Sequence, residues 1–148
     1  MSLEQKINDG IKAAMLAKDK IRLESLRAVK AAILLAKTSE SAKDFDEAAE
    51  IKMLQKLVKQ RRETAEIYAS NNRQELADKE LAEAAIIEEF LPKQLSEQEI
   101  ESVLKSIIEE TGANSVKDMG KVMGIASKQL AGKADGKLIA ELVKKLLQ

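Results

Sequence analysis

The organisation of this chain is decided by residues 86–104, IIEEFLPKQLSEQEIESVL, where one helical pattern ends and another begins. Pro92 is the only proline in the sequence, and a proline disfavours helix at the residue before it, which here is Leu91. Shortly after the proline, Ser96 and Glu99 have the spacing of a capping box, a signal that opens a helix. The stretch therefore predicts a boundary between two helical lobes.

The lobe before the boundary, residues 1–92, is predicted to contain about four helices. Residues typical of helix starts precede the first three: Ser2 with Gln5, Asp19, and Asp44 with Glu47. Asn71 and Asn72 mark the turn before the fourth. In the second segment Leu26, Val29 and Ile33 share one face, and in the third Ile51, Leu54, Val58, Ala65 and Tyr68 have helical spacing. The fourth segment runs through Leu76, Leu81, Ile87 and Phe90. Arg61 falls within the third stripe, where such an arginine usually pairs with a carboxylate or extends past the apolar surface.

The lobe after the boundary, residues 93–148, is predicted to contain about three helices around one apolar core. The first of them ends at Gly112, a residue suited to a C-cap. Ser115 starts the second and Gly132 ends it, while Asp135 caps the third. No segment has the pattern of a strand, so we expect an all-α fold with two helical subdomains.

Composition removes several classes of chemistry. The sequence has no cysteine and no histidine, which excludes disulfides, thiolate metal sites and the commonest general acid–base residue. It also lacks the Gly-Lys-Ser/Thr of the phosphate-binding loop, so nucleotide hydrolysis is not inferred. We expect no catalytic residue, no metal ligand and no cofactor in this chain.

No apolar run approaches the roughly 20 residues of a membrane span. The segment from Met1 to Lys12 is amphipathic and lacks the apolar stretch of a signal peptide. These features predict a cytoplasmic protein without a membrane partner.

Charge is distributed unevenly along a chain whose formal net charge is zero. Residues 1–74 carry a net charge of +4, residues 75–110 of −8, and residues 112–148 of +4. A neutral total can therefore conceal a local surface that attracts anions.

The predicted helix after Ser115 separates into two faces when it is drawn at roughly 100° per residue. One face is apolar and is expected to point to the core: Val116, Met119, Met123, Ala126 and Leu130. The opposite face holds two glycines and three lysines: Lys117, Gly120, Lys121, Gly124 and Lys128. A glycine inside a helix costs about 1 kcal/mol relative to alanine. On an exposed face it lets the backbone of a partner approach closely, and flanking lysines suit phosphate groups.

The following turn continues this pattern as Gly132-Lys133-Ala134-Asp135-Gly136-Lys137. Gly132 suits a left-handed C-cap, and Asp135 suits the N-cap of the last helix. Free amides at that helix start, with Lys133 and Lys137 beside them, could hold a phosphate. Two other interpretations stay open: these residues can be ordinary helix punctuation with solvated lysines, and the paired glycines can contact a helix of the other lobe.

Several motifs together resemble the YqeY-like proteins over essentially the whole chain: RLESLR at 22–27, KLVKQRRE at 56–63, Leu91-Pro92, MGKVM at 119–123 and GKADGK at 132–137. Residues 96–148 are also similar to the tail domain of the GatB component of aspartyl/glutamyl-tRNA amidotransferase. The resemblance implies two all-helical parts and a link to tRNA, with Gly120, Lys121, Gly132, Lys133 and Gly136 as the corresponding candidates. The amidotransferase tail usually has Asn-Pro where this chain has Asp135-Gly136, so helix capping is the role expected for Asp135.

The resemblance to this family also implies the activity of a carbon–nitrogen ligase with glutamine as amido-N-donor. This chain has no nucleophile motif and no nucleotide loop, and the resemblance to GatB covers only its tail. We therefore do not expect that activity from this chain on its own.

Three hypotheses about function follow. The first is a non-catalytic accessory protein of tRNA binding or tRNA metabolism, which recognises phosphates and shape because three scattered aromatics form no stacking platform. The second is an interaction module or subunit that associates with an amidotransferase or an aminoacyl-tRNA synthetase, where the acidic residues Glu80, Glu83, Glu88 and Glu89 could meet a basic partner. The third is an enzyme component that is active only in a complex.

Overall fold

The computed structural model describes residues 1–39 and 42–148, and all regular structure in these ranges is helical. This confirms the all-α class. The chain divides into two compact units, Met1–Leu91 and Pro92–Gln148. No helix in the described ranges has both the length and the apolar character needed to cross a membrane.

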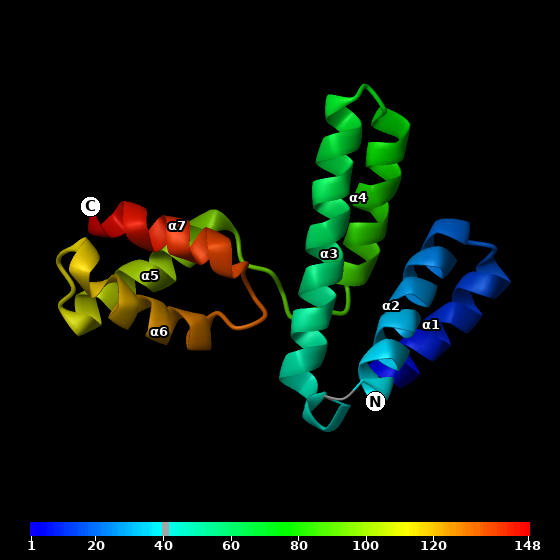
Figure 1. Cartoon of the computed structure of the whole chain (residues 1–148), viewed down its shortest axis with the longest axis horizontal. Coiled ribbons are helices and arrows are strands. Elements are labelled where there is room, and N and C mark those ends of the chain that lie inside the picture. The colour runs from blue at the N-terminus through cyan, green and yellow to red at the C-terminus, as the bar shows by residue number, and fades with distance from the viewer. Residues whose placement is uncertain (40–41) are drawn as a thin grey trace. The chain divides into compact units, whose positions relative to one another are not determined.

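The first unit consists of two helical hairpins (Figure 1). Its elements are α1 (Leu3–Ala17), α2 (Lys20–Thr38), the short 3-10 turn η1 (Ala42–Asp44), α3 (Glu47–Ser70) and α4 (Gln74–Glu88). Ser2 and Gln5 form a complete capping box at α1, and Asp19 caps α2 through the amide of Arg22. The predicted starts of the first two helices are therefore confirmed.

The predicted start of α3 at Asp44 is wrong by two residues. Asp44 closes the η1 turn, and its carbonyl accepts the amide of Asp46 at 2.9 Å. The cap is Asp46, whose carboxylate accepts the amide of Ala49 at 2.9 Å. Asp44 and Asp46 are both suitable N-cap residues. Asp44 belongs to the 3-10 turn, so Asp46 is the residue that caps α3.

The core of this unit is built almost entirely from aliphatic residues. Its buried members come from α1 to α4: Ile7, Leu26, Val29, Ile33, Leu54, Val58, Ala84 and Ile87. On α4 the inward face is small, because Ala77 and Ala84 are buried whereas Leu76 and Leu81 are exposed. The leucines are the larger apolar residues, but the alanines lie toward the neighbouring helices.

The second unit is a three-helix group made of α5 (Glu97–Thr111), α6 (Met119–Gln129) and α7 (Gly136–Leu147), with the 3-10 turn η2 (Val116–Asp118) before α6 (Figure 1). Ser96 accepts the amide of Glu99, and Gly112 ends α5 with a left-handed φ of 71°. The predicted start of α5 at Ser96 and its end at Gly112 are confirmed. The core includes Ile100, Leu104, Ile107, Val122, Ala126, Leu130, Ile139, Leu142 and Val143.

Two details of the predicted second helix in this unit are wrong. Ser115 makes no side-chain capping bond, and instead the Asp118 carboxylate accepts the amide of Asn114 at 3.1 Å. Val116 is exposed whereas Val122 is fully buried. The cause is η2, because a 3-10 turn has 3.0 residues per turn and breaks the helical period extrapolated from Val116.

Candidate functional site

One face of α6 and the preceding turn is open to solvent. Lys117, Gly120, Lys121, Gly124 and Lys128 are all exposed, whereas Val122, Ala126 and Leu130 are buried on the other side of the helix. The predicted exposure of the two glycines and three lysines is therefore confirmed, although Lys117 lies on η2 and not on α6. We call these five residues, together with Lys133, Gly136 and Lys137, the glycine–lysine surface.

The two glycines of α6 have no structural explanation within their own unit. A Cβ atom built on Gly120 or Gly124 meets nothing within 4 Å. Neither glycine has a positive φ, so an L side chain would not be strained there. Gly10 of α1 is different, because a Cβ there would come within 2.9 Å of Leu26 Cδ1. Close packing thus explains Gly10 but not the pair on α6.

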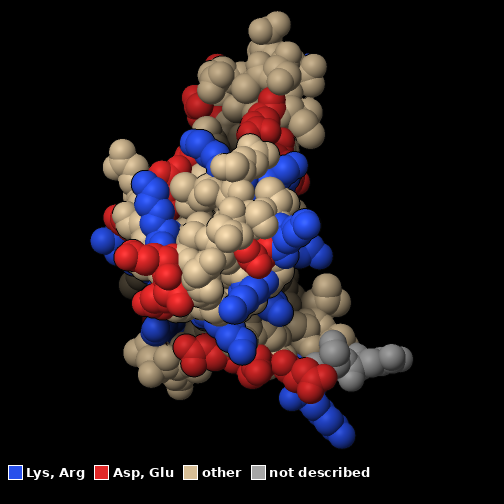
Figure 2. All heavy atoms as spheres, turned by 90° about the vertical axis from the view of Figure 1, so that its left-hand side faces the viewer, with Lys and Arg blue, Asp and Glu red and all other residues tan. Residues whose placement is uncertain are grey.

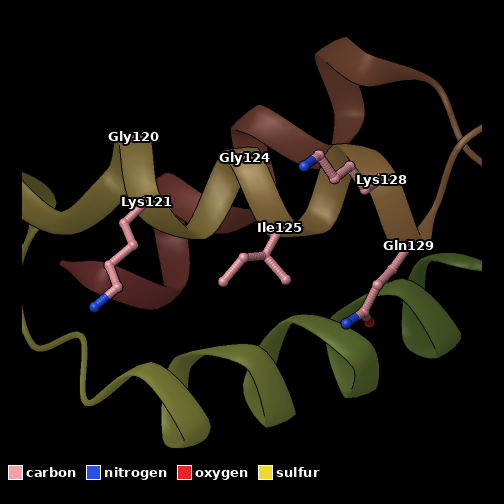
Figure 3. A pocket seen from close by; sticks show the side chains of 6 residues that line it. All are labelled: Gly120, Lys121, Gly124, Ile125, Lys128 and Gln129. Atoms are coloured by element: carbon pink, nitrogen blue, oxygen red, sulfur yellow. The ribbon is translucent and has the colours of Figure 1, made fainter.

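A shallow hollow of about 430 Å³ follows this stripe. Its lining comes entirely from α6: Gly120, Lys121, Gly124, Ile125, Lys128 and Gln129. Figure 3 shows the side chains of Lys121, Ile125 and Gln129 extending from α6, while Gly120 and Gly124 leave the ribbon without a side chain. The hollow is therefore lined by backbone at the two glycines, by the aliphatic side chain of Ile125 and by the lysines Lys121 and Lys128.

The turn between α6 and α7 extends the glycine–lysine surface. α6 ends at Gln129, not at Gly132 as predicted, and a short turn follows in which the amide of Lys133 donates to the carbonyl of Leu130 at 2.9 Å. Gly132 has a φ of 75°, a left-handed conformation that suits glycine. The predicted conformation of Gly132 is therefore confirmed, although it is not the helix cap itself.

Asp135 is the N-cap of α7, as predicted, and its carboxylate accepts the amide of Lys137 at 3.5 Å, the long end of hydrogen bonding. Lys133, Gly136 and Lys137 are exposed around it, and a Cβ on Gly136 would meet nothing within 4 Å. Because the Asp135 carboxylate already occupies this helix start, capping is the role that its geometry supports.

Gly132 differs from the other candidate residues because it is buried. Its carbonyl accepts a hydrogen bond from Gln94 Nε2 at 2.6 Å. The structure thus assigns Gly132 a part in shaping the turn that carries Lys133, and contact of Gly132 with a partner stays a prediction.

Sequence reasoning missed Gln94, which lies in the stretch that was used only to locate the lobe boundary. A glutamine outside any helical period carries no signal of a long-range contact. Only the folded chain brings it to the turn that precedes α7.

The lysines of the glycine–lysine surface form no ion pair within the part of the chain that the structure describes. In the same unit, the exposed Lys145 lies 3.9 Å from Glu101, so ion pairing is available elsewhere. Figure 2 shows Lys and Arg interspersed with Asp and Glu on the face that it draws, with no broad area of one sign. The positive charge here is local and not a general coat.

Three of the four acidic residues predicted to meet a basic partner form ion pairs inside the first unit. Glu83 pairs with Arg61, Glu88 with Arg62, and Glu89 with Arg22 in a two-pronged contact at 2.9 and 3.1 Å. The hydrogen bonds to Glu89 raise the pKa of Arg22, although burial opposes them. These three carboxylates therefore have partners within the chain, whereas docking of a basic protein stays a prediction.

In residues 1–39 and 42–148, no three acidic side chains come together in a way that could hold a metal ion. The arrangement on α6 offers ammonium groups, bare backbone and one aliphatic side chain. The chemistry of such a surface suits an anionic chain.

Comparison with known proteins identifies a family and several relatives. The family model described as "Yqey-like protein" matches residues 4–147. The protein named "Altered inheritance of mitochondria protein 41, mitochondrial" of Lachancea thermotolerans is 32% identical over 102 residues, which are 68% of this chain and 54% of the relative. Its namesake in Pyrenophora tritici-repentis is 31% identical over 144 residues, 93% of this chain and 75% of the relative.

A shorter match is to part of an amidotransferase. A glutamyl-tRNA(Gln) amidotransferase component of Thermococcus sibiricus is 44% identical over 59 residues, which are 36% of this chain and 9% of that protein. The chain spans about half the length of the first of the mitochondrial relatives. What these relatives do as whole proteins is therefore not carried over to this chain as a finding.

Proposed function

This chain belongs to the Yqey-like protein family, and from that premise we propose that it is a non-catalytic accessory protein that binds tRNA. The observation that carries the proposal is the pair of exposed glycines on α6. Each leaves open space where a side chain would stand, in a hollow flanked by Lys121 and Lys128. A helix that keeps such glycines gives up stability, and close approach by a partner's backbone is a physical reason to keep them.

The chemistry of the second unit favours recognition of the RNA backbone over its bases. Residues 92–148 contain neither an aromatic residue nor an arginine. Bases therefore have no ring to stack on, and the forked guanidinium that reads guanine is absent. Lysine ammonium groups are compact point charges that suit phosphates. We expect recognition of backbone and shape, with an affinity that falls as salt rises.

The amidotransferase match supports the choice of tRNA among RNAs, because that relative is named for a reaction on glutamyl-tRNA. We do not propose that this chain alone has carbon–nitrogen ligase activity with glutamine as the amide donor. A purified chain that hydrolysed glutamine or ATP would contradict this part of the proposal.

A cytoplasmic location stays the proposal for this chain, although the matched fungal proteins are named as mitochondrial. Either compartment contains tRNA, so the proposed role does not depend on the choice. Cell fractionation followed by detection of the chain tests the location directly.

A gel-shift titration with a tRNA transcript tests the proposed site. The triple variant Lys121→Glu/Lys133→Glu/Lys137→Glu should lose the shifted band at every protein concentration that shifts the wild type. The matched control is Lys52→Glu/Lys56→Glu/Lys59→Glu, which changes the net charge equally on the exposed side of α3. If the first triple variant retained tRNA as well as the wild type does, the site would be wrong. If both triple variants lost tRNA binding equally, the binding would depend on net charge alone and not on this surface.

A second candidate function, docking of a partner helix, is favoured by one specific feature. Ile125 is half-buried beside the two glycines. Gly120 and Gly124 are four residues apart and therefore lie on the same face of the helix. A partner helix could approach closely there. A pull-down performed with and without ribonuclease separates the two functions, because recovery of an amidotransferase or synthetase that resists the nuclease supports docking.

A further inference from the structure

The side-chain amide of Gln94 connects two separate parts of the second unit. Its Nε2 atom lies 2.8 Å from the carbonyl oxygen of Pro92 and 2.6 Å from that of Gly132. An amide NH2 group has two donor hydrogens, so both are used. The contact is partly buried and bridges 38 positions of sequence.

A backbone contact lies directly beside it. The amide of Leu95 donates to the carbonyl of Lys133 at 2.9 Å. The two consecutive carbonyls of the turn, those of Gly132 and Lys133, are thus both held against residues 94–95. The left-handed Gly132 and the bond from Lys133 to Leu130 complete the shape of the turn.

The direction of these carbonyls matters for anion binding. A carbonyl oxygen is the negative end of the peptide dipole and repels a phosphate. With both oxygens engaged by residues 94–95, the turn exposes the Lys133 side chain while its acceptor groups are occupied. Without Gln94, the Gly132 carbonyl would lose its side-chain partner and would need another donor.

We propose that Gln94 is a positioning residue for the glycine–lysine surface, which it serves by fixing the turn that carries Lys133. This inference rests on the proposed binding of RNA. Gln94 makes no contact with the RNA itself. Its effect passes through Lys133, so removal of either residue should abolish the same interaction.

The test combines a structural readout with a binding cycle. Hydrogen exchange should show faster exchange at the amides of Leu95 and Lys133 in Gln94→Ala, with the core amides of α5 unchanged. Gln94→Asn is the second variant. The asparagine side chain is one methylene shorter, so its amide cannot reach both carbonyls. We therefore expect the same faster exchange as in Gln94→Ala, with less disturbance of packing. Gln98→Ala, at an exposed position of α5, is the matched control and should change neither readout.

Binding is then measured with a tRNA transcript over a range of salt concentrations. We expect Gln94→Ala, Gln94→Asn and Lys133→Gln each to weaken binding about fivefold to tenfold near 0.1 M salt, with the salt slope reduced by about one phosphate contact. The double variant Gln94→Ala/Lys133→Gln should be no weaker than Lys133→Gln alone, because the two residues act as one unit.

The outcomes separate this inference from the proposed function. If the wild type does not bind tRNA, the proposed function fails, and the exchange data still decide whether Gln94 fixes the turn. Unchanged exchange at Leu95 and Lys133 in both Gln94 variants would overturn the inference. Fully additive losses in the double variant would also overturn it, because they would show that Gln94 acts independently of Lys133.

Discussion

Arg61 of α3 and Glu83 of α4 form a largely buried ion pair, with Arg61 Nε 3.3 Å from Glu83 Oε2. Their side chains are only 17% and 13% exposed. Arg61 Nη1 also donates to the carbonyl of Leu57 at 3.2 Å, whereas its Nε has no well-aligned hydrogen-bond acceptor. The attraction at Nε is therefore mainly between charges. The pair fastens the α3–α4 hairpin and confirms the prediction that Arg61 pairs with a carboxylate.

Removing one partner of this pair should be costly. Glu83→Ala leaves the Arg61 guanidinium without its carboxylate in a poorly solvated place, and we expect the free energy of unfolding to fall by about 2 kcal/mol. Urea denaturation measures the change. The control is Glu101→Ala, which breaks the exposed pair with Lys145 and should cost less than about 1 kcal/mol. Equal losses in the two variants would contradict the structural role of Arg61 and Glu83.

Replacing Gly124 with alanine should separate stability from binding. The added methyl group meets no atom within 4 Å, and alanine is the better helix former. We therefore expect the free energy of unfolding to rise by about 0.5–1 kcal/mol while tRNA affinity falls. Thermal denaturation and gel shift on the same preparation check both. A variant that is stabilised and binds tRNA as tightly as the wild type would show that the glycine is not kept for close approach.

Asp135 offers a test of the turn before α7. Asparagine is an equally good N-cap but carries no charge, so Asp135→Asn should keep stability and strengthen tRNA binding between Lys133 and Lys137. Asp135→Ala removes the cap and should cost about 1 kcal/mol of stability. Denaturation and salt-dependent binding distinguish the two variants. Weaker binding in Asp135→Asn would instead indicate that the carboxylate itself takes part in recognition.

Glu50, near the start of α3, should make stability depend weakly on pH. Partial burial, and then the neighbouring Glu47, raise the pKa of Glu50, while Lys37 opposes them. A folded-state pKa above the unfolded value favours the native state at low pH, and this contribution is lost as pH rises through the folded pKa. Glu50→Gln should therefore match the wild type at about pH 3 and be more stable at about pH 7. A variant that is less stable at about pH 7 would contradict this direction.

Local signals predicted the helices well where a single residue decides the structure. Ser2, Asp19, Ser96 and Gly112 each act within one turn of chain, so spacing alone identified their roles. Signals failed where two local structures competed. The turn at Asp44 and the turn at Val116 are both 3-10, and each displaced a helix boundary or face that the helical period had predicted.

The exposed glycine–lysine stripe could be predicted because a helical wheel depends only on position along α6. Contacts between segments that are distant in the sequence could not be predicted in this way. The bonds from Gln94 to the Gly132 turn, and the pairing of the acidic segment with Arg22, Arg61 and Arg62, arise only when the chain is folded. Both changed the interpretation: Gly132 was found to shape the turn, and three carboxylates of the acidic segment were found to pair within the fold.

The most direct measurement of the central claim is sequencing of the RNA that co-purifies with the chain from cells. The account predicts that tRNA is enriched with the wild type and is lost from Lys121→Glu/Lys133→Glu/Lys137→Glu, while Lys52→Glu/Lys56→Glu/Lys59→Glu retains it. If the wild type carried no enriched tRNA, or if the first triple variant carried the same tRNA as the wild type, the claim that the glycine–lysine surface binds tRNA would be contradicted.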